Sequence, residues 1–247
     1  MKALRFRLGG ATAFFKKPDV NAYLYFTYGN IHKVALLGII GSVLGLKGYN
    51  LQGNDTYPEF YSELLNLKVA VVPNNHRGYI PKKIQTFNNS VGYASQEQGG
   101  NLIVKEQWLE KPNWSIYVML DGNFHTEEIK DRFLNYDFMY IPYLGKNDHF
   151  ANVTNVEVVQ LKESYKPQYI HSLFLKGYFE FSYNEDNFID EDFECGEKWK
   201  YEERLPIALE EHANQYVTES FVFTNMKVKL KKECKLYSYE GKELFFL

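Results

Sequence analysis

A stripe of small side chains within one predicted helix places the strongest constraint on how this chain can fold. Asn30 is a favourable N-cap, and the apolar residues after it predict a helix over residues 31–46. Small residues recur in this helix at i, i+3, i+4 and i+7, on a single face: Gly38, Gly41, Ser42 and Gly45. Each glycine costs a helix about 1 kcal/mol relative to alanine. A neighbouring backbone or sheet must therefore approach this face closely, and we predict that the face packs on a sheet.

The first residues of the chain predict a strand that is buried on one side. Leu4, Phe6 and Leu8 alternate with Arg5 and Arg7. Because successive side chains of a strand point to opposite faces, the apolar residues face a core and the arginines face outward. The sequence therefore predicts a half-buried strand with a basic outer face.

The remaining pattern predicts an α+β fold. We expect further helices at 56–67 and 126–135, and further strands at 68–73, 102–109, 114–120 and 156–161. This order is compatible with a ferredoxin-like (RRM-type) βαββαβ core. Residues 74–101 are long and rich in Asn, Gly, Ser and Gln, which is typical of a functional loop, and we predict a projecting thumb or hairpin there.

The last third of the chain is expected to be a β-rich extension of the same compact unit. Residues 162–212 are mixed and acidic, and the final residues predict two or three strands with a hairpin turn at Glu240-Gly241. No linker separates the two parts. We therefore expect an RRM-like core over 1–161, with the thumb inserted at about 74–101, and a C-terminal part over 162–247.

The charge is unevenly distributed along the chain. The formal net charge is −3, yet residues 1–33 hold six Lys and Arg against one Asp, and residues 224–242 hold six Lys against two Glu. Residues 180–211 hold twelve acids against three bases. A local basic surface binds phosphates whatever the total charge is, so the basic segments are candidates for RNA binding, and the acidic segment is a solvated face or a surface for a basic partner.

The sequence lacks the common motifs of catalytic and metal-binding sites. There is no P-loop, Rossmann, HExxH, CxxC or GxSxG pattern, and the two cysteines, Cys195 and Cys234, fit neither a metal site nor a disulfide framework. We expect no cofactor, no metal and no membrane segment, and a cytoplasmic location. Metal-free RNA cleavage would need a proton-transfer group, for which His32, His76 and Tyr28 are the candidates.

Cations and aromatic rings are interleaved near the amino terminus. Single-stranded RNA is held by cations on its phosphates and by aromatic rings on its unstacked bases. One segment supplies both kinds of group: Lys16, Lys17, Tyr23, Tyr25, Tyr28, His32 and Lys33. Arg5 and Arg7 are expected to lie beneath it, and Arg77, Lys82 and Lys83 in the predicted thumb add further cations. The small-residue face of the helix has two alternative roles. It packs this segment closely on the sheet, or it contacts RNA directly.

Three blocks of the sequence resemble the fifth CRISPR-associated protein family. The first is "FFKKPDVNAYLYFTYGNIHKVALLGIIGSVLGLKGY" after the basic strand, which is similar to the family's amino-terminal signature. The others are "VKEQWLEKPNWSIYV" at 104–118 and "YIPYLGKNDHFANV" at 140–153. The blocks fall in the family's order over residues 1–160 and are most similar to its type I-B branch.

The resemblance implies a subunit of the Cascade surveillance complex. Such a subunit caps the 5′ handle of the CRISPR RNA, docks on the backbone and large subunits, and meets target DNA only indirectly. It has an RRM-like core and a thumb, here at 74–101, that reaches the adjacent backbone subunit. Two alternatives remain open. Type I-C members also cleave precursor RNA with a Tyr and a Lys-His pair, but this chain has only the reversed pair His32-Lys33, so we expect no enzymatic activity. The chain could also bridge subunits without touching RNA.

Overall fold

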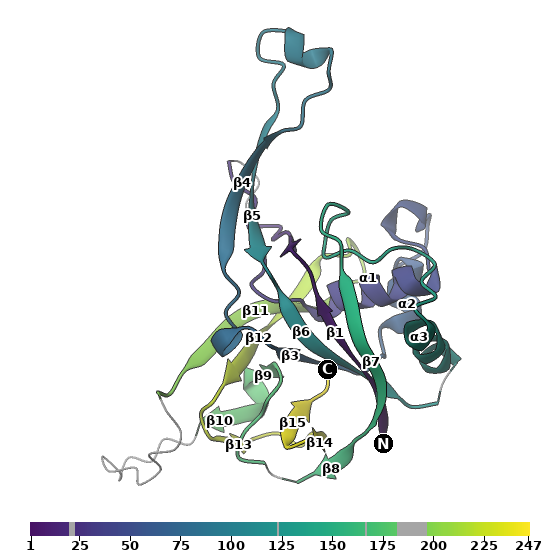
Figure 1. Cartoon of the computed structure of the whole chain (residues 1–247), viewed down its shortest axis with the longest axis vertical. Coiled ribbons are helices and arrows are strands. Elements are labelled where there is room, and N and C mark those ends of the chain that lie inside the picture. The colour runs from purple at the N-terminus through teal and green to yellow at the C-terminus, as the bar shows by residue number, and fades with distance from the viewer. Residues whose placement is uncertain (20–22, 123, 166, 182–196) are drawn as a thin grey trace.

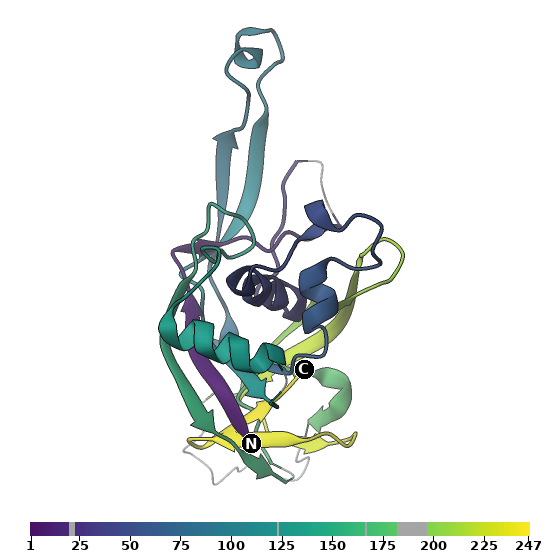
Figure 2. The same ribbon diagram turned by 90° about the vertical axis from the view of Figure 1, so that its right-hand side faces the viewer.

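The computed structural model describes residues 1–19, 23–122, 124–165, 167–181 and 197–247 as an α+β structure in which antiparallel sheets predominate (Figure 1). A central four-stranded antiparallel sheet has the order β3-β6-β1-β7. Its strands are β1 (Lys2–Gly9), β3 (Val69–Pro73), β6 (Asn113–Leu120) and β7 (Asn152–Gln160). Helices α1 (Lys33–Leu44) and α2 (Glu59–Leu64) connect β1 to β3, and α3 (Phe124–Asn135) connects β6 to β7. The three helices lie together on one side of the molecule (Figure 2).

The predicted alternation of the first strand is present in β1. Leu4, Phe6 and Leu8 are buried in the main core with α1 and α3, and they form the inner face of the sheet. Arg7 is exposed on the outer face, as the alternation predicts. Ala3, on the same outer face, is nevertheless fully buried, because the C-terminal strands cover that end of the sheet.

Helix α1 begins later than the sequence indicates. Its N-cap is His32, whose Nδ1 accepts a hydrogen bond from the Ala35 amide at 3.2 Å. Asn30, the predicted cap, is buried instead. Its side-chain amide donates to the Gly78 carbonyl at 3.1 Å, and its Oδ1 accepts from the Trp114 indole at 2.9 Å. Asn30 therefore joins three distant segments, and the neighbouring histidine caps the helix.

The small-residue face of α1 packs on α2, so the predicted helix–sheet packing is wrong. A Cβ placed on Gly41 would lie 2.6 Å from Phe60 Cβ, whereas one on Gly38 would lie at an ordinary 3.7 Å from the Phe60 ring. Gly45 serves a different purpose, because it ends the helix in the left-handed conformation with φ of 83°. The close approach that the glycines indicate is therefore a helix–helix contact concentrated at Gly41.

A long hairpin projects from the body of the molecule (Figure 1). It is formed by β4 (Lys82–Asn88) and β5 (Ile103–Glu110), and the short strand β2 (Thr12–Ala13) pairs with the base of β5. The projection starts at Lys82, later than the predicted boundary at 74. Residues 74–81 belong to the body, because Ile80 is buried in the main core.

The C-terminal part forms three small antiparallel sheets, ordered β11-β12-β9, β10-β13 and β15-β14-β8. The strands are β8 (Lys162–Ser164), β9 (Phe174–Leu175), β10 (Phe179–Phe181), β11 (Lys200–Leu209), β12 (Tyr216–Thr224), β13 (Val228–Leu230), β14 (Leu236–Tyr239) and β15 (Lys242–Phe245). Short 3-10 turns occur at Tyr49–Leu51, His76–Gly78, Ala94–Gln96 and Lys176–Tyr178. The predicted turn at Glu240-Gly241 joins β14 to β15, with positive φ at both residues. Leu205 and Phe221 enter the main core, so this part shares one core with the central sheet.

The sequence predicted a β-rich C-terminal part but not the individual strands between 162 and 209, because several of them are only two or three residues long. Residues 182–196 of the predicted acidic segment at 180–211 lie outside the described residues, and Cys195 is among them. None of the helices in the described ranges combines the length and apolar character that crossing a bilayer requires.

Candidate nucleic-acid interface

The amino-terminal segment that carries the predicted cations folds back on itself. The Lys17 amide donates to the Phe26 carbonyl at 2.8 Å, and the Tyr28 amide donates to the Phe15 carbonyl at 2.8 Å. The hydroxyl of Thr27, which is buried, accepts from the Phe15 amide at 3.0 Å. These bonds hold Lys16 and Lys17 beside the returning strand of the segment.

The same segment runs along the edge of the projecting hairpin at its root. The Tyr25 amide donates to the Lys105 carbonyl at 2.9 Å, and the Gln107 amide donates to the Tyr25 carbonyl at 2.9 Å. Tyr25 thus extends the β4–β5 sheet by a short parallel bridge. The bridge brings the cations of residues 16–17 to those of β4 and β5.

An open hollow of about 280 Å³ lies where the segment meets the hairpin, and it is lined by one acidic and two basic residues with three others: Lys17, Asp19, Phe26, Thr27, Lys82 and Gln107. Lys105 is exposed and stands two residues before Gln107, on the same face of β5. In the same segment the Lys16 ammonium lies 4.2 Å from the centre of the Tyr25 ring, a cation–π contact. We call this set the hairpin-root surface: Lys16, Lys17, Tyr25, Phe26, Lys82, Lys105 and Gln107.

Glu203 on β11 anchors the segment from below. Its carboxylate pairs with Lys17 Nζ at 3.0 Å and accepts two hydrogen bonds from the Gly29 amide, at 2.9 and 3.1 Å. The Tyr201 hydroxyl donates to the same group at 2.5 Å. A Cβ on Gly29 would lie 2.5 Å from that hydroxyl, so glycine is required for the approach. Lys17 is therefore largely neutralised.

Lys82 and its neighbours are more available to a ligand. Burial lowers the pKa of the Lys82 ammonium, nearby Glu203 raises it, and the positive charge of Lys17 lowers it. Lys16, Lys82 and Lys105 form no ion pair with any residue that the structure describes. These three ammonium groups supply the net positive charge of the hairpin-root surface.

Tyr28 and His32 are buried, so their predicted contact with RNA is wrong for this fold. Tyr28 is 4% exposed and His32 is 3% exposed, and both pack edge-on with Tyr216. Desolvation lowers the pKa of His32 to about 3, so the imidazole is neutral and caps α1. Burial, with the nearby charge of Asp19, raises the pKa of Tyr28 to about 12. These two rings point inward and hold the segment on the core.

The other predicted site residues are dispersed. Tyr23 is 91% exposed on the loop of the segment, and Lys83 lies on the opposite face of the hairpin from Lys82, near the Trp108 ring. Arg77 is engaged in an ion pair with Glu197 at 2.7 Å. Lys33 is half-buried in the first turn of α1, where desolvation lowers its pKa. Arg5 and Arg7 lie on the outer face of the central sheet, and Arg5 pairs there with Glu157.

A buried polar brace that was not predicted from the sequence supports the hairpin root. Glu106 is 4% exposed, and its carboxylate accepts from Lys146 Nζ at 3.0 Å and from the Trp108 indole at 2.8 Å. The imidazole of His149 stands against Trp108 and shares a 2.7 Å hydrogen bond with Thr12. Burial lowers the pKa of His149. This brace fixes the hairpin to the 143–150 loop. In the sequence, only the alternation of β5 indicates that Glu106 faces inward.

Within the described ranges, no group of three or more His, Cys, Asp or Glu side chains is placed to hold a metal ion. His76, a candidate for metal-free cleavage, is exposed on the body. The other two candidates, Tyr28 and His32, are buried.

Comparison with known proteins finds likeness in structure and none in sequence. No protein-family model and no curated protein matches the chain. A chain of a "CRISPR RNA-guided surveillance complex" superposes with a TM-score of 0.53 at 11% identity, covering 92% of this chain and 91% of that one. A "CRISPR protein from Archaeoglobus fulgidus" superposes with a TM-score of 0.51 at 9% identity, covering 99% and 98%. The chain therefore shares its α+β fold, over nearly its whole length, with proteins of CRISPR systems.

Proposed function

We propose that this chain is a subunit of a CRISPR RNA-guided surveillance complex, in which it binds and caps the 5′ handle of the CRISPR RNA. The observation that carries the proposal is the hairpin-root surface, which distributes three lysines without ion pairs to described residues, and the Tyr25 ring, along the base of a projecting hairpin. Cations and rings together are what a single strand requires. The fold is shared with a chain of such a complex, which supports this context.

The four-stranded sheet with α1 and α3 is, on this proposal, an RRM-type core of the fifth CRISPR-associated family, type I-B branch. Its βαββαβ order and antiparallel β3-β6-β1-β7 sheet support the assignment. The protein acts in the cytoplasm, without a cofactor and without catalysis, and meets target DNA only through its partners.

The projecting hairpin is the thumb that reaches the neighbouring backbone subunit. Large apolar side chains are exposed along it, which favours burial against another protein. They are Ile84, Val91, Tyr93, Leu102 and Ile103. A second exposed apolar group follows α3 and supports a separate contact with the large subunit: Met139, Tyr140, Ile141, Tyr143 and Phe150. Two such surfaces on one chain are what a bridging subunit needs.

The test is RNA binding by a variant of the hairpin-root surface. We expect the triple variant Lys16→Ala, Lys82→Ala, Lys105→Ala to bind a single-stranded RNA of the handle sequence more weakly. Its plot of log affinity against log salt concentration should be less steep by about 0.7 for each phosphate that the variant no longer neutralises. The control is the triple variant Lys162→Ala, Lys229→Ala, Lys235→Ala, which removes the same charge from exposed sites on C-terminal strands and turns. Equal binding by the two variants would refute the proposal.

Two further measurements separate the alternatives. Incubation of the purified protein with repeat RNA in EDTA should leave the RNA intact, and cleavage there would make the chain an endoribonuclease. Photocrosslinking in the assembled complex should give RNA adducts within 16–27 and 82–107. An intact complex without such adducts would make the chain a structural bridge that does not touch RNA.

A further inference from the structure

The outer face of the central sheet is only partly covered. The β14–β15 hairpin lays Tyr237 and Leu244 on one end of it, over Ala3, Tyr117 and Val159, and these side chains form a separate buried cluster. Among the residues that the structure describes, none forms such a cover over the other end of the same face. The apolar pattern ends at this boundary, where the face of the sheet is open to solvent.

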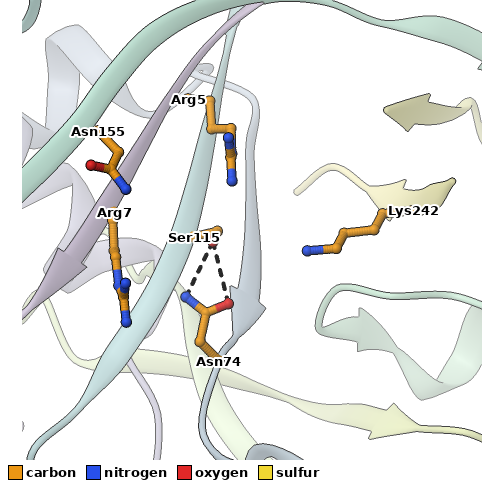
Figure 3. Close-up of a pocket in the computed structure, with 6 residues that line it drawn as sticks. All are labelled: Arg5, Arg7, Asn74, Ser115, Asn155 and Lys242. Carbon is orange, nitrogen blue, oxygen red and sulfur yellow. Dashed lines mark hydrogen bonds between the residues drawn. The ribbon is translucent and has the colours of Figure 1, made fainter. Parts of the chain in front are cut away.

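Beyond the boundary the face is polar and positively charged. A hollow of about 220 Å³ opens there, and Figure 3 shows the six side chains that line it: Arg5, Arg7, Asn74, Ser115, Asn155 and Lys242. Three of the six are cations and none is acidic or aromatic. Glu157 lies beside the hollow and pairs with Arg5, which leaves the charges of Arg7 and Lys242 uncompensated.

The strands fix where these groups point. In the sheet Arg7 lies opposite Ser115 on β6 and Thr154 on β7. A β-bulge in the β1–β7 pairing then brings Asn155, with φ of 52°, to the rim. Lys242 stands two residues before the fully buried Leu244 on β15, so it is directed from the same face toward the sheet.

Hydrogen bonds orient the donors further. Arg7 Nε donates to Asn113 Oδ1 at 2.8 Å, and the Asn74 amide donates to the same oxygen at 2.9 Å and to Ser115 Oγ at 3.1 Å. The bond from Nε fixes the orientation of the Arg7 guanidinium. Among the described residues neither Arg7 nor Lys242 has an ion-pair partner.

We infer that this hollow, which we call the outer-face site, binds phosphate groups of the RNA backbone. Guanidinium, ammonium, amide and hydroxyl groups are the usual donors to phosphate oxygens, and such contacts position a nucleic acid without reading its sequence. Because no aromatic ring lines the site, it offers no base stacking. The inference rests on the proposed RNA-binding function and adds a second, sequence-independent contact to it.

A short turn connects the outer-face site to the hairpin-root region. The Asn75 side chain accepts from the Asn113 amide at 3.1 Å and donates to the Lys111 carbonyl at 3.2 Å. Lys111 is exposed on this turn, directly after β5. It adds an exposed cation to the turn between β5 and β6. An acidic protein segment is the other ligand that such cations suit, but the lining lacks the apolar and aromatic side chains typical of the centre of a protein interface.

The experiment measures the salt dependence of binding of an oligouridine RNA, for which base identity is constant. The double variant Arg7→Gln, Lys242→Gln should have a salt slope less steep by about 1.4, which is 0.7 for each of two neutralised phosphates. Its thermal unfolding should match the wild-type protein, because Arg7 is exposed and Lys242 has no ion-pair partner among the described residues. The variant Arg7→Lys, which retains the charge, should recover most of the slope. The control, Lys229→Gln with Lys235→Gln, removes two exposed charges elsewhere and should leave the slope unchanged.

The outcomes distinguish this inference from the proposed function. If the triple variant of the hairpin-root surface loses affinity and the double variant keeps the wild-type slope, the outer-face site does not bind RNA. Loss of complex assembly with an unchanged slope would overturn the inference in favour of an acidic protein partner. If neither variant changes the binding of RNA, the proposed function itself fails.

Discussion

Alanine substitutions at two glycines of the same helical face should change stability in opposite directions. Gly38→Ala places its new Cβ 3.7 Å from the Phe60 ring, an ordinary contact, whereas Gly41→Ala places it 2.6 Å from Phe60 Cβ and 3.5 Å from Phe60 Cα. Cβ and Cα belong to the rigid part of Phe60 and cannot turn away. Helix α2 would have to move as a unit, and this would disturb the packing of its own buried side chains, Phe60, Tyr61 and Leu64.

The magnitudes follow from two opposing terms. Replacing a helical glycine by alanine stabilises the folded state by about 1 kcal/mol. Gly38→Ala should gain most of this, since nothing must move. At Gly41 the same gain is opposed by an overpacking cost of roughly 1–3 kcal/mol. We therefore expect Gly41→Ala to lose about 1 kcal/mol, and the two variants to differ by about 1–3 kcal/mol.

Urea unfolding of the two variants and the wild-type protein, followed by circular dichroism, measures this difference. For a chain of this size it corresponds to about 2–4 °C in Tm for each kcal/mol. The m-value should be unchanged, which would show that the denatured state is the same in all three. Equal stabilisation by both substitutions would show that α2 yields freely at Phe60, and would refute the close packing of α1 on α2.

Three further predictions test groups that hold helix α1, the amino-terminal segment and the hairpin root. The pKa of His32 is lowered from 6.5 to about 3, so the unfolded chain binds more protons below pH 6.5. The stability from His32 is complete above that pH and falls by about 2 kcal/mol between pH 7 and pH 5. Urea midpoints should shift accordingly, and an equally steep decline in His32→Asn would contradict this role. Glu203→Ala removes the acceptor of the Gly29 amide and the ion-pair partner of Lys17, and should lower stability by about 2 kcal/mol. Glu203→Gln should have an intermediate effect. Identical Tm values for the two variants would exclude the anchoring role. Lys146→Met leaves the buried Glu106 carboxylate without its cation and should lower stability by about 2 kcal/mol. Adding Glu106→Gln should restore part of the stability, and a purely additive double variant would argue against the pair.

Local patterns in the sequence were sufficient for elements whose faces are set by neighbouring residues. The alternation of Leu4, Phe6 and Leu8 predicted the inner face of β1, and the turn at Glu240-Gly241 predicted the last hairpin. The order of helices and strands indicated the α+β class. In each case the pattern lies within a few residues of the chain, so it can be recognised without knowledge of the fold.

The candidate site was predicted only in part. The sequence brought Lys16, Lys17 and Tyr25 into one segment, but it could not show that Lys82 and Lys105 meet them, because that depends on a bridge between residues 25 and 106. It also could not show which rings of the segment turn inward.

The sequence by itself determined that α1 must have a close neighbour, since glycines that recur on one helical face cost stability unless something approaches that face. Only the tertiary structure decided that the neighbour is Phe60 of α2, and that Tyr28 and His32 are buried while Lys16 remains in water. Periodicity specifies the face of an element. What covers that face depends on contacts between residues far apart in the chain, and those are set by how the whole core packs.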